Sequence, residues 1–251
     1  MTRTLGPEFR DALEMARAAA QDHTAQARRA AAERKRAADQ RAEWERAADA
    51  RGVPAHEAMR ACILRPDLDG SCITEVRRAV RWQRERKRAA GAAVGGGVVL
   101  FLSGDPGCGK TVALGWACAR YVPPPLARRP RGTLPGDAAR FAYASDVVRL
   151  ARAQFGHELE QAQAILGVRL LCLDEAGVET DPSALAEILM RRIAEERPTI
   201  LATNLTPEEL EQRYFTSGAG AGRLQSRLVG QHVAGQPWVY VCTDADRRLG
   251  L

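Results

Sequence analysis

Residues 104–111 have the residue types and the spacing of a phosphate-binding loop. They read Gly-Asp-Pro-Gly-Cys-Gly-Lys-Thr, which matches G-x-x-x-x-G-K-[ST]. In such a loop the backbone N–H groups point at phosphate oxygens, and the helix that follows adds partial positive charge at its N-terminus. We expect Lys110 to reach the β- and γ-phosphates of a nucleotide and the Thr111 hydroxyl to hold Mg²⁺. The residues predicted to contact the nucleotide are Gly104, Asp105, Pro106, Gly107, Cys108, Gly109, Lys110 and Thr111.

An acidic pair follows a second apolar segment. Residues 169–175 read Arg-Leu-Leu-Cys-Leu-Asp-Glu, which is typical of a buried parallel strand with carboxylates at its C-terminal end. Ligand sites of open α/β sheets lie at those ends. We expect Asp174 to orient Mg²⁺ and Glu175 to act as the general base on the attacking water. Alone, such a pair could also cap the next helix, but together with the phosphate loop it indicates an ATP–Mg²⁺ site.

A polar amide ends a third apolar segment, residues 198–203. Asn204 could hold the attacking water beside the γ-phosphate. It could instead cap the predicted helix 206–214, which for an isolated Asn is the more common role. Both interpretations stay open from the sequence.

The elements that must position these residues alternate between strands and helices. Such alternation predicts an α/β fold with a mostly parallel sheet and crossover helices. Upstream, residues 8–50 are rich in Ala, Arg and Glu and lack helix breakers, so they predict one or two long helices whose apolar stripe is too thin to form a core alone. The predicted strands are 98–102, 141–144, 169–173, 198–203 and 237–242. The predicted parts are a helical segment 1–50, a small helical region with a basic linker 51–94, and an ATPase domain 95–251.

The chain has 251 residues and a net charge of +6, and nearly all of its basic residues are Arg. Because Ala is also abundant, the charge alone is weak evidence for nucleic acid. The segment 77–88 is strongly basic around Trp82 and could follow a DNA backbone with Trp82 stacked on a base, or could be a solvated helix with Trp82 partly buried. The loop 122–140 carries Arg128, Arg129 and Arg131 and could also touch DNA.

The six cysteines are scattered and form no C-x-x-C pair, which indicates a reducing cytoplasmic location. No run is long enough to span a membrane, and no secretory leader follows Met1. We expect buried thiols at Cys108, Cys118, Cys172 and Cys242. Residues His56, Cys62 and Cys72 could ligate a metal, although their spacing fits no zinc template.

Taken in order, these motifs resemble those of the AAA+ ATPases, and most closely the DnaC/DnaI helicase loaders and the related IstB transposition ATPases. The resemblance covers about residues 95–250 and extends to the strand 197–205 and the helix 222–228. It implies a parallel five-stranded sheet of order 5-1-4-3-2 with little or no C-terminal lid. It also implies that Arg227 is an arginine finger and that Arg247 is a sensor of the bound nucleotide. The first 90 residues match no part of that family.

The resemblance implies an ATPase that loads a replicative helicase onto single-stranded DNA. The N-terminal helices would bind the helicase, and the ATPase domains would assemble side by side. One alternative is an IstB-like ATPase that regulates a transposase. Another is a nucleotide-gated adaptor with negligible turnover, which the complete set of Asp174, Glu175 and Asn204 disfavours.

Overall fold

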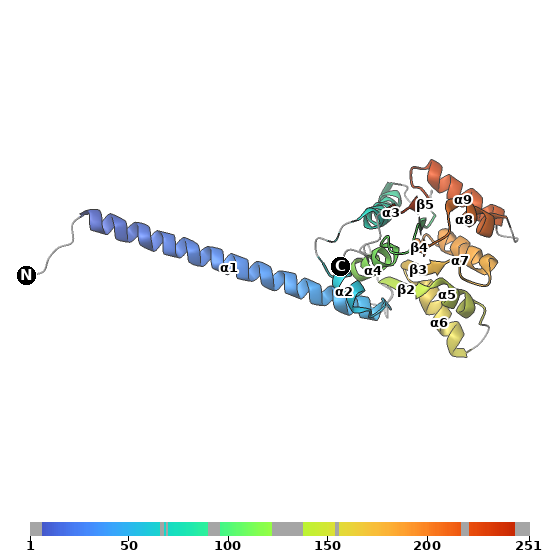
Figure 1. Ribbon diagram of the computed structural model, residues 1–251, viewed down its shortest axis with the longest axis horizontal. Helices are drawn as coiled ribbons and strands as arrows, with labels where there is room; N and C mark the ends of the chain where they lie inside the picture. Colours follow the sequence, from blue (N-terminus) through green and yellow to red (C-terminus); the bar gives the residue numbers. More distant parts are fainter. Residues whose placement is uncertain are drawn as a thin grey trace, which may run out of the picture. The chain divides into compact units, whose positions relative to one another are not determined.

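The computed structural model describes residues 7–65, 68, 70–89, 96–121, 138–153, 156–216 and 221–243. The chain divides into two compact units, Met1–Glu43 and Trp44–Leu251. A single helix, α1 (Pro7–Ala50), accounts for the predicted helical segment (Figure 1). It ends where Gly52 takes a left-handed backbone conformation with φ of 74°, which glycine adopts at little cost. None of the helices within these ranges is long and apolar enough to cross a membrane.

The second unit is built on a five-stranded, wholly parallel sheet of order β2-β3-β4-β1-β5. Read from the other edge this is 5-1-4-3-2, so the predicted AAA+ order is confirmed. Each predicted strand is present, with ends that differ by at most three residues. The strands are β1 (Val99–Ser103), β2 (Ala139–Tyr143), β3 (Leu170–Ala176), β4 (Thr199–Thr203) and β5 (Val239–Val241).

Eight further helices within the described ranges surround this sheet (Figure 1). Successive β1 residues alternate between its two faces, as a pleated strand requires. Leu100 and Leu102 join a core formed with α2, α3 and α4, whereas Val99 and Phe101 join a core formed with α5, α7, α8 and α9. The helices are α2 (Glu57–Ile63), α3 (Ser71–Ala89), α4 (Lys110–Arg120), α5 (Ala144–Ala151), α6 (Gly156–Gly167), α7 (Pro182–Ala194), α8 (Pro207–Phe215) and α9 (Ala221–Val233).

The segment between α1 and the sheet is bonded directly to the α/β core. The backbone O of Arg51 accepts a 2.8 Å hydrogen bond from the N–H of Phe141 on the edge strand β2. Its guanidinium donates to the last carbonyls of α4, including Cys118 O at 2.5 Å. Gln83 of α3 accepts from the Val98 N–H at 2.7 Å, just before β1. Arg51 and Gln83 of this segment therefore fix the residue just before β1 and the end of α4 by hydrogen bonds. The three-part division at 50 and 94 stays a prediction.

One arginine, Arg192, is buried next to the core that α5, α7, α8 and α9 form with the sheet. Arg192 of α7 is 1% exposed, and it donates to Thr199 Oγ1 at 2.8 Å, Leu166 O at 2.7 Å and Pro198 O at 2.9 Å. Burial, together with the nearby Arg197, lowers the pKa of Arg192 to about 9. Through Leu166, Pro198 and Thr199, this side chain bonds the end of α6 and the start of β4 to α7, and a further bond to Val168 O at 3.1 Å holds the segment just before β3.

Candidate nucleotide site

The phosphate loop connects β1 to α4, as the sequence predicts. Gly104 has φ of 144°, and a Cβ added there would lie 2.7 Å from Cys242 O. Gly109 caps α4 in a left-handed conformation with φ of 95°. Only glycine meets both demands without strain, and the result is a tight loop that leads straight into the N-terminus of α4.

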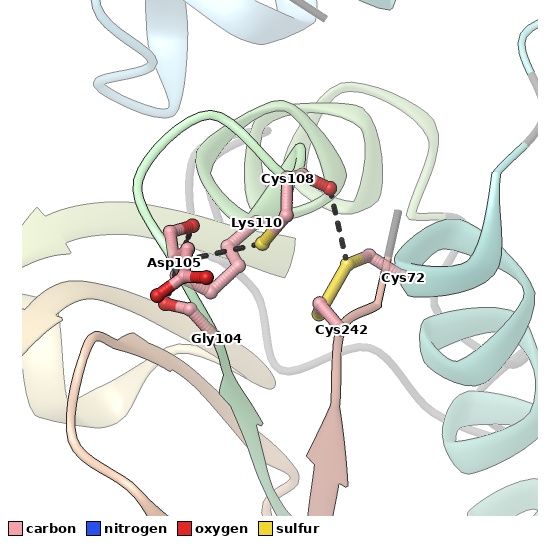
Figure 2. The surroundings of a disulfide bond; sticks show 6 residues. All are labelled: Cys72, Gly104, Asp105, Cys108, Lys110 and Cys242. Atoms are coloured by element: carbon pink, nitrogen blue, oxygen red, sulfur yellow. Dashed lines mark hydrogen bonds between the residues drawn. A yellow bond between two sulfur atoms is a disulfide. The ribbon is translucent and has the colours of Figure 1, made fainter. Parts of the chain in front are cut away.

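Lys110 lies under this loop and is 7% exposed. Its Nζ donates to the carbonyl oxygens of Gly104 at 2.6 Å and Asp105 at 2.8 Å, and lies 3.4 Å from Cys108 Sγ (Figure 2). A buried ammonium needs such partners, because an unpaired one is costly. The charge predicted to meet phosphate is thus held in place by the loop itself.

Thr111 and Asp174 come together, as predicted for the magnesium ligands. The Asp174 carboxylate is 7% exposed and accepts hydrogen bonds from the Thr111 side chain and from the backbone N–H of Glu175, the latter at 3.0 Å. Burial raises the pKa of Asp174, and the bonds from Thr111 and Glu175 and the charge of Lys110 offset this in part. A hydroxyl and a carboxylate at one point are hard oxygen ligands of the kind Mg²⁺ prefers, so these residues fit the ion.

Glu175 stands beside Asp174 on an unusual backbone. Its φ is 56°, and the register between β3 and β4 is irregular between Leu173 and Ala176. The side chain is exposed, whereas the rest of β3 is buried. The irregularity therefore turns a carboxylate out of the sheet edge and beside the phosphate loop, where a general base is expected.

Asn204 does not cap a helix. The cap of α8 is Thr206, whose side chain accepts from the Glu209 N–H while the Glu209 side chain accepts from the Thr206 N–H. Asn204 is exposed, and the turn around it is fixed because Ser103 Oγ donates to Leu205 O at 2.6 Å. The capping interpretation is wrong, since a complete capping box two residues later already serves that role.

One cavity of about 770 Å³ joins these side chains. This is within the range of pockets that bind nucleotide-sized ligands. The phosphate loop, Asp174, Glu175 and Asn204 line its polar end, whereas Met59 and Ile73 are among the apolar residues of its other wall. The polar end suits a triphosphate with Mg²⁺, and the apolar wall suits a flat heterocyclic base.

Glu179 supports the site, although no sequence pattern predicted a role for it. It is 1% exposed, accepts from the Gly177 N–H at 2.7 Å, and accepts from Arg213 and Tyr214 of α8 at 3.0 and 2.7 Å. It therefore anchors the turn after the acidic pair to α8. No spacing rule marks this residue, because its partners are 34 and 35 positions away.

Arg227, the predicted arginine finger, is not part of this cavity. Arg227 is exposed on α9, where Leu224 and Leu228 of the same helix are buried, and it does not line the cavity. Arg247 and the loop arginines Arg128, Arg129 and Arg131 lie outside the described residues. Trp82 is partly buried against the first core and donates to Ala234 O at 3.4 Å, which supports the buried interpretation over base stacking.

The expectation for one cysteine is wrong. Cys242 is not a free thiol but is paired with Cys72 in a disulfide (Figure 2). Since 170 residues separate the two, the sequence offers no spacing that reveals the pair. Cys108, Cys118 and Cys172 are buried free thiols, as predicted. Cys72 gathers with Cys108 and Cys242 rather than with Cys62 and His56 in the predicted metal group.

No family model matches the chain, and no curated protein sequence is significantly similar to it. Among solved structures, a crystal structure of DnaI is similar with 20% identity and a TM-score of 0.49, over 79% of this chain and 99% of that one. A proposed primosome component from Streptococcus pyogenes serotype M3 has 21% identity and a TM-score of 0.46, over 78% and 93%. AMPPCP-bound DnaA from Aquifex aeolicus has 21% identity and a TM-score of 0.39, over 68% and 48%.

The order of the strands carries the assignment of the fold. The phosphate loop follows the strand that lies between β4 and β5, and the acidic pair ends the strand beyond β4. This arrangement is the one implied by the family resemblance that residues 104–111, 171–177 and 197–205 carry. The chain has the AAA+ fold expected from its resemblance to the DnaC/DnaI and IstB proteins.

Proposed function

We propose that this protein binds ATP with Mg²⁺ and hydrolyses it. The observation that carries the proposal is the convergence of Lys110, Thr111, Asp174, Glu175 and Asn204 on a single cavity with an apolar wall. A phosphate loop alone would support binding only. A buried carboxylate beside the Thr111 hydroxyl, with an exposed carboxylate next to it, supports turnover as well.

The roles of the residues follow from their positions. Thr111 and Asp174 would hold Mg²⁺, which when bound would neutralise charge on the phosphates. Lys110 exchanges its bonds to the loop carbonyls for bonds to phosphate oxygens. Glu175 accepts the proton of the attacking water on its exposed carboxylate, and Asn204 orients that water. The helix N-terminus at Lys110 adds favourable charge to the phosphate end.

Hydrolysis is completed by a second copy of the chain. Charge grows on the phosphoryl oxygens in the transition state, and a guanidinium there speeds phosphoryl transfer by about 10³- to 10⁵-fold in known systems. Arg227 is exposed and away from its own cavity. We therefore assign it to the cavity of a neighbouring subunit in a side-by-side assembly.

The wider function we propose is that of a replication protein which loads a replicative helicase on single-stranded DNA. This rests on the motif resemblance and on helix α1. Over residues 26–40 every side chain of α1 is exposed, so the helix has surface available for a partner. The AAA+ domain would then report nucleotide state to that partner.

A basic groove on the α3–α4 surface is our candidate for DNA contact. Arg77 Cζ lies 4.8 Å and Arg120 Cζ 5.4 Å from the ring centre of Trp116. Burial and the charge of Arg77 lower the pKa of Arg120 to about 10. An anionic phosphate would relieve that repulsion. Arg81 and Arg84 line the same groove, which holds about 440 Å³.

The DNA proposal is tested by salt titration. Each phosphate contact to a single strand contributes a log–log slope of about −0.7. Arg81→Ala should flatten the slope by about that amount, while Arg191→Ala on α7, an exposed arginine away from the groove, should not. Equal slopes for both variants and the wild type would remove the groove from the DNA interface.

Three assays separate the candidate functions. If the wild-type protein hydrolyses no ATP under any condition, the two ATPase candidates are excluded and the nucleotide-gated adaptor remains. Complex formation between the full chain and purified replicative helicase, lost on deletion of residues 1–43, supports the loader. Complex formation with a transposase on duplex DNA, and none with the helicase, supports the IstB-like alternative.

A further inference from the structure

Three cysteine sulfur atoms meet at the base of the phosphate loop. Cys72 comes from the first turn of α3, Cys108 from the loop and Cys242 from the residue after β5 (Figure 2). Their Sγ atoms all lie within 4.8 Å of one another, and the three residues are 2%, 3% and 6% exposed. We propose that, once the Cys72–Cys242 disulfide is reduced, these residues form a binding site for one thiophilic divalent ion such as Zn²⁺.

The spacing suits metal ligation. Zinc–sulfur bonds of about 2.3 Å in tetrahedral geometry place the sulfurs roughly 3.8 Å apart. Sulfurs that already lie within 4.8 Å of one another reach this spacing through small side-chain shifts. Because the three come from three separate elements, the ligands are gathered by the fold and not by a local sequence motif.

The local charge also suits a thiolate site. Three thiolates and a divalent ion carry a net charge of −1, which is costly in a buried place unless a cation is near. Lys110 Nζ lies 3.4 Å from Cys108 Sγ and supplies that cation. Two of the three cysteines, Cys72 and Cys108, also line the nucleotide cavity, so a water molecule can reach the ion from there as the fourth ligand.

The disulfide and the metal site exclude each other. A dithiol reductant transfers two electrons to the Cys72–Cys242 bond, leaves two thiols and becomes a cyclic disulfide. On binding the ion, the three thiols of Cys72, Cys108 and Cys242 lose their protons to the solvent. Oxidation of Cys72 and Cys242 by a small-molecule disulfide, which takes up the two electrons and becomes two thiols, withdraws two of the three ligands and so releases the metal.

The site differs from the metal group expected from the sequence. Cys62 is a free, half-buried thiol and His56 is exposed. Both line the nucleotide cavity, yet neither belongs to the sulfur cluster. Cys62 therefore provides a matched control for the cluster cysteines.

The test uses the full chain, first reduced with a dithiol, then freed of reductant and metal, and titrated with Co²⁺ alone. Thiolate ligation gives a sulfur-to-cobalt charge-transfer band, and we expect it to saturate at one ion per chain. Zn²⁺ should displace the Co²⁺ and abolish the band. Cys72→Ser, Cys108→Ser and Cys242→Ser should each lower Zn²⁺ affinity by roughly 10²-fold or more, whereas Cys62→Ser should leave it unchanged.

A second arm needs no variant and so does not depend on a substituted chain folding. Wild-type protein with the disulfide intact should show no charge-transfer band, and the band should appear on reduction. Equal Co²⁺ binding by oxidised and reduced protein overturns the proposal. So does a band that survives in all three cluster variants but is lost in Cys62→Ser. Neither result depends on ATP turnover, so the outcome is independent of the proposed ATPase activity.

Discussion

The charged side chains of the nucleotide cavity and those on the outer face of α9 differ in their burial and in their bonding partners. In the cavity Lys110 and Asp174 are buried, and each is bonded to neighbouring groups of its own domain. On α9 the guanidinium of Arg227 is exposed, and within the described part of the chain it has no hydrogen-bond or ion-pair partner. We propose that the domain supplies its own phosphate site and that a neighbouring subunit completes the hydrolysis site.

The contrast matters because arginine is so common here. Arg192 and Arg227 lie on helices that pack against the same face of the sheet, and yet one is 1% exposed and the other is exposed to solvent. A buried arginine with three or more carbonyl or hydroxyl acceptors is a structural residue. An exposed arginine on a helix whose buried side is apolar is available for another molecule.

The largest expected effect is on nucleotide binding. Lys110→Ala removes the lysine that lines the cavity beside the phosphate loop, and the loss of one charge-assisted contact of about 3 kcal/mol corresponds to roughly 10²-fold weaker ATP binding. Calorimetry with ATP and Mg²⁺ measures it. Lys35→Ala, an exposed lysine on α1, is the control and should bind normally. Unchanged affinity in Lys110→Ala would break the assignment of the cavity.

The next effect is on turnover alone. Glu175→Gln keeps the size of the side chain but removes the base, so steady-state hydrolysis should fall by roughly 10²-fold or more. Affinity for ATP should stay close to that of the wild type, because Asp174 and Thr111 are untouched. Glu187→Gln on α7, also exposed, serves as the control. Near-normal hydrolysis by the Glu175 variant would remove it from its role.

The mixing experiment addresses the comparison directly. Arg227→Ala should bind ATP and hydrolyse it poorly, and Lys110→Ala should fail to bind ATP yet still carry Arg227. Mixing the two should restore part of the activity, since some interfaces then pair an intact loop with an intact arginine. Turnover is measured across mixing ratios at fixed ATP. Absence of recovery, when co-assembly is demonstrated, would place Arg227 in its own subunit or on an inert surface.

The smallest expected effect is on stability and its pH dependence. Burial raises the pKa of Asp174 above 3.8 in the folded state, so the folded protein binds a proton more readily than the unfolded chain. Stability from this group therefore rises as pH falls through the folded pKa towards 3.8. Without nucleotide or Mg²⁺, Asp174→Asn should be more stable than the wild type at pH 7, and the gap should narrow on acidification. Urea unfolding at several pH values measures the free energy of unfolding of the variant and of the wild type. A difference between them that does not change with pH would contradict the prediction.

Much of the frame was predictable from local patterns. The apolar segments before Gly104, at Leu170 and at Thr199 indicate buried strands. The phosphate loop identifies the segment before Gly104 as the strand that leads into the nucleotide site. Their order in the sheet followed from the family resemblance, because no local pattern encodes which strands are neighbours. The capping box at Thr206 follows a local rule, since Thr and Glu three positions apart form it, but the sequence analysis considered only Asn204 as the cap of this helix.

Long-range partners were not predictable. Glu179 and Arg192 contact groups that the fold, and not the sequence spacing, brings to them. The same holds for Cys72 and Cys242, which come from distant elements. Residue type gave no help, because acids and arginines are abundant throughout the chain.

The backbone at Glu175 has a consequence for directed evolution. A glutamate at φ of 56° occupies a conformation that costs of the order of 1 kcal/mol or more and that glycine adopts freely. A library selected only for survival on heating should therefore enrich Glu175→Gly, and the enriched clones should be more heat-resistant and unable to turn over ATP. Selection for ATP hydrolysis would therefore retain Glu at position 175, whereas selection for heat resistance would favour Gly there.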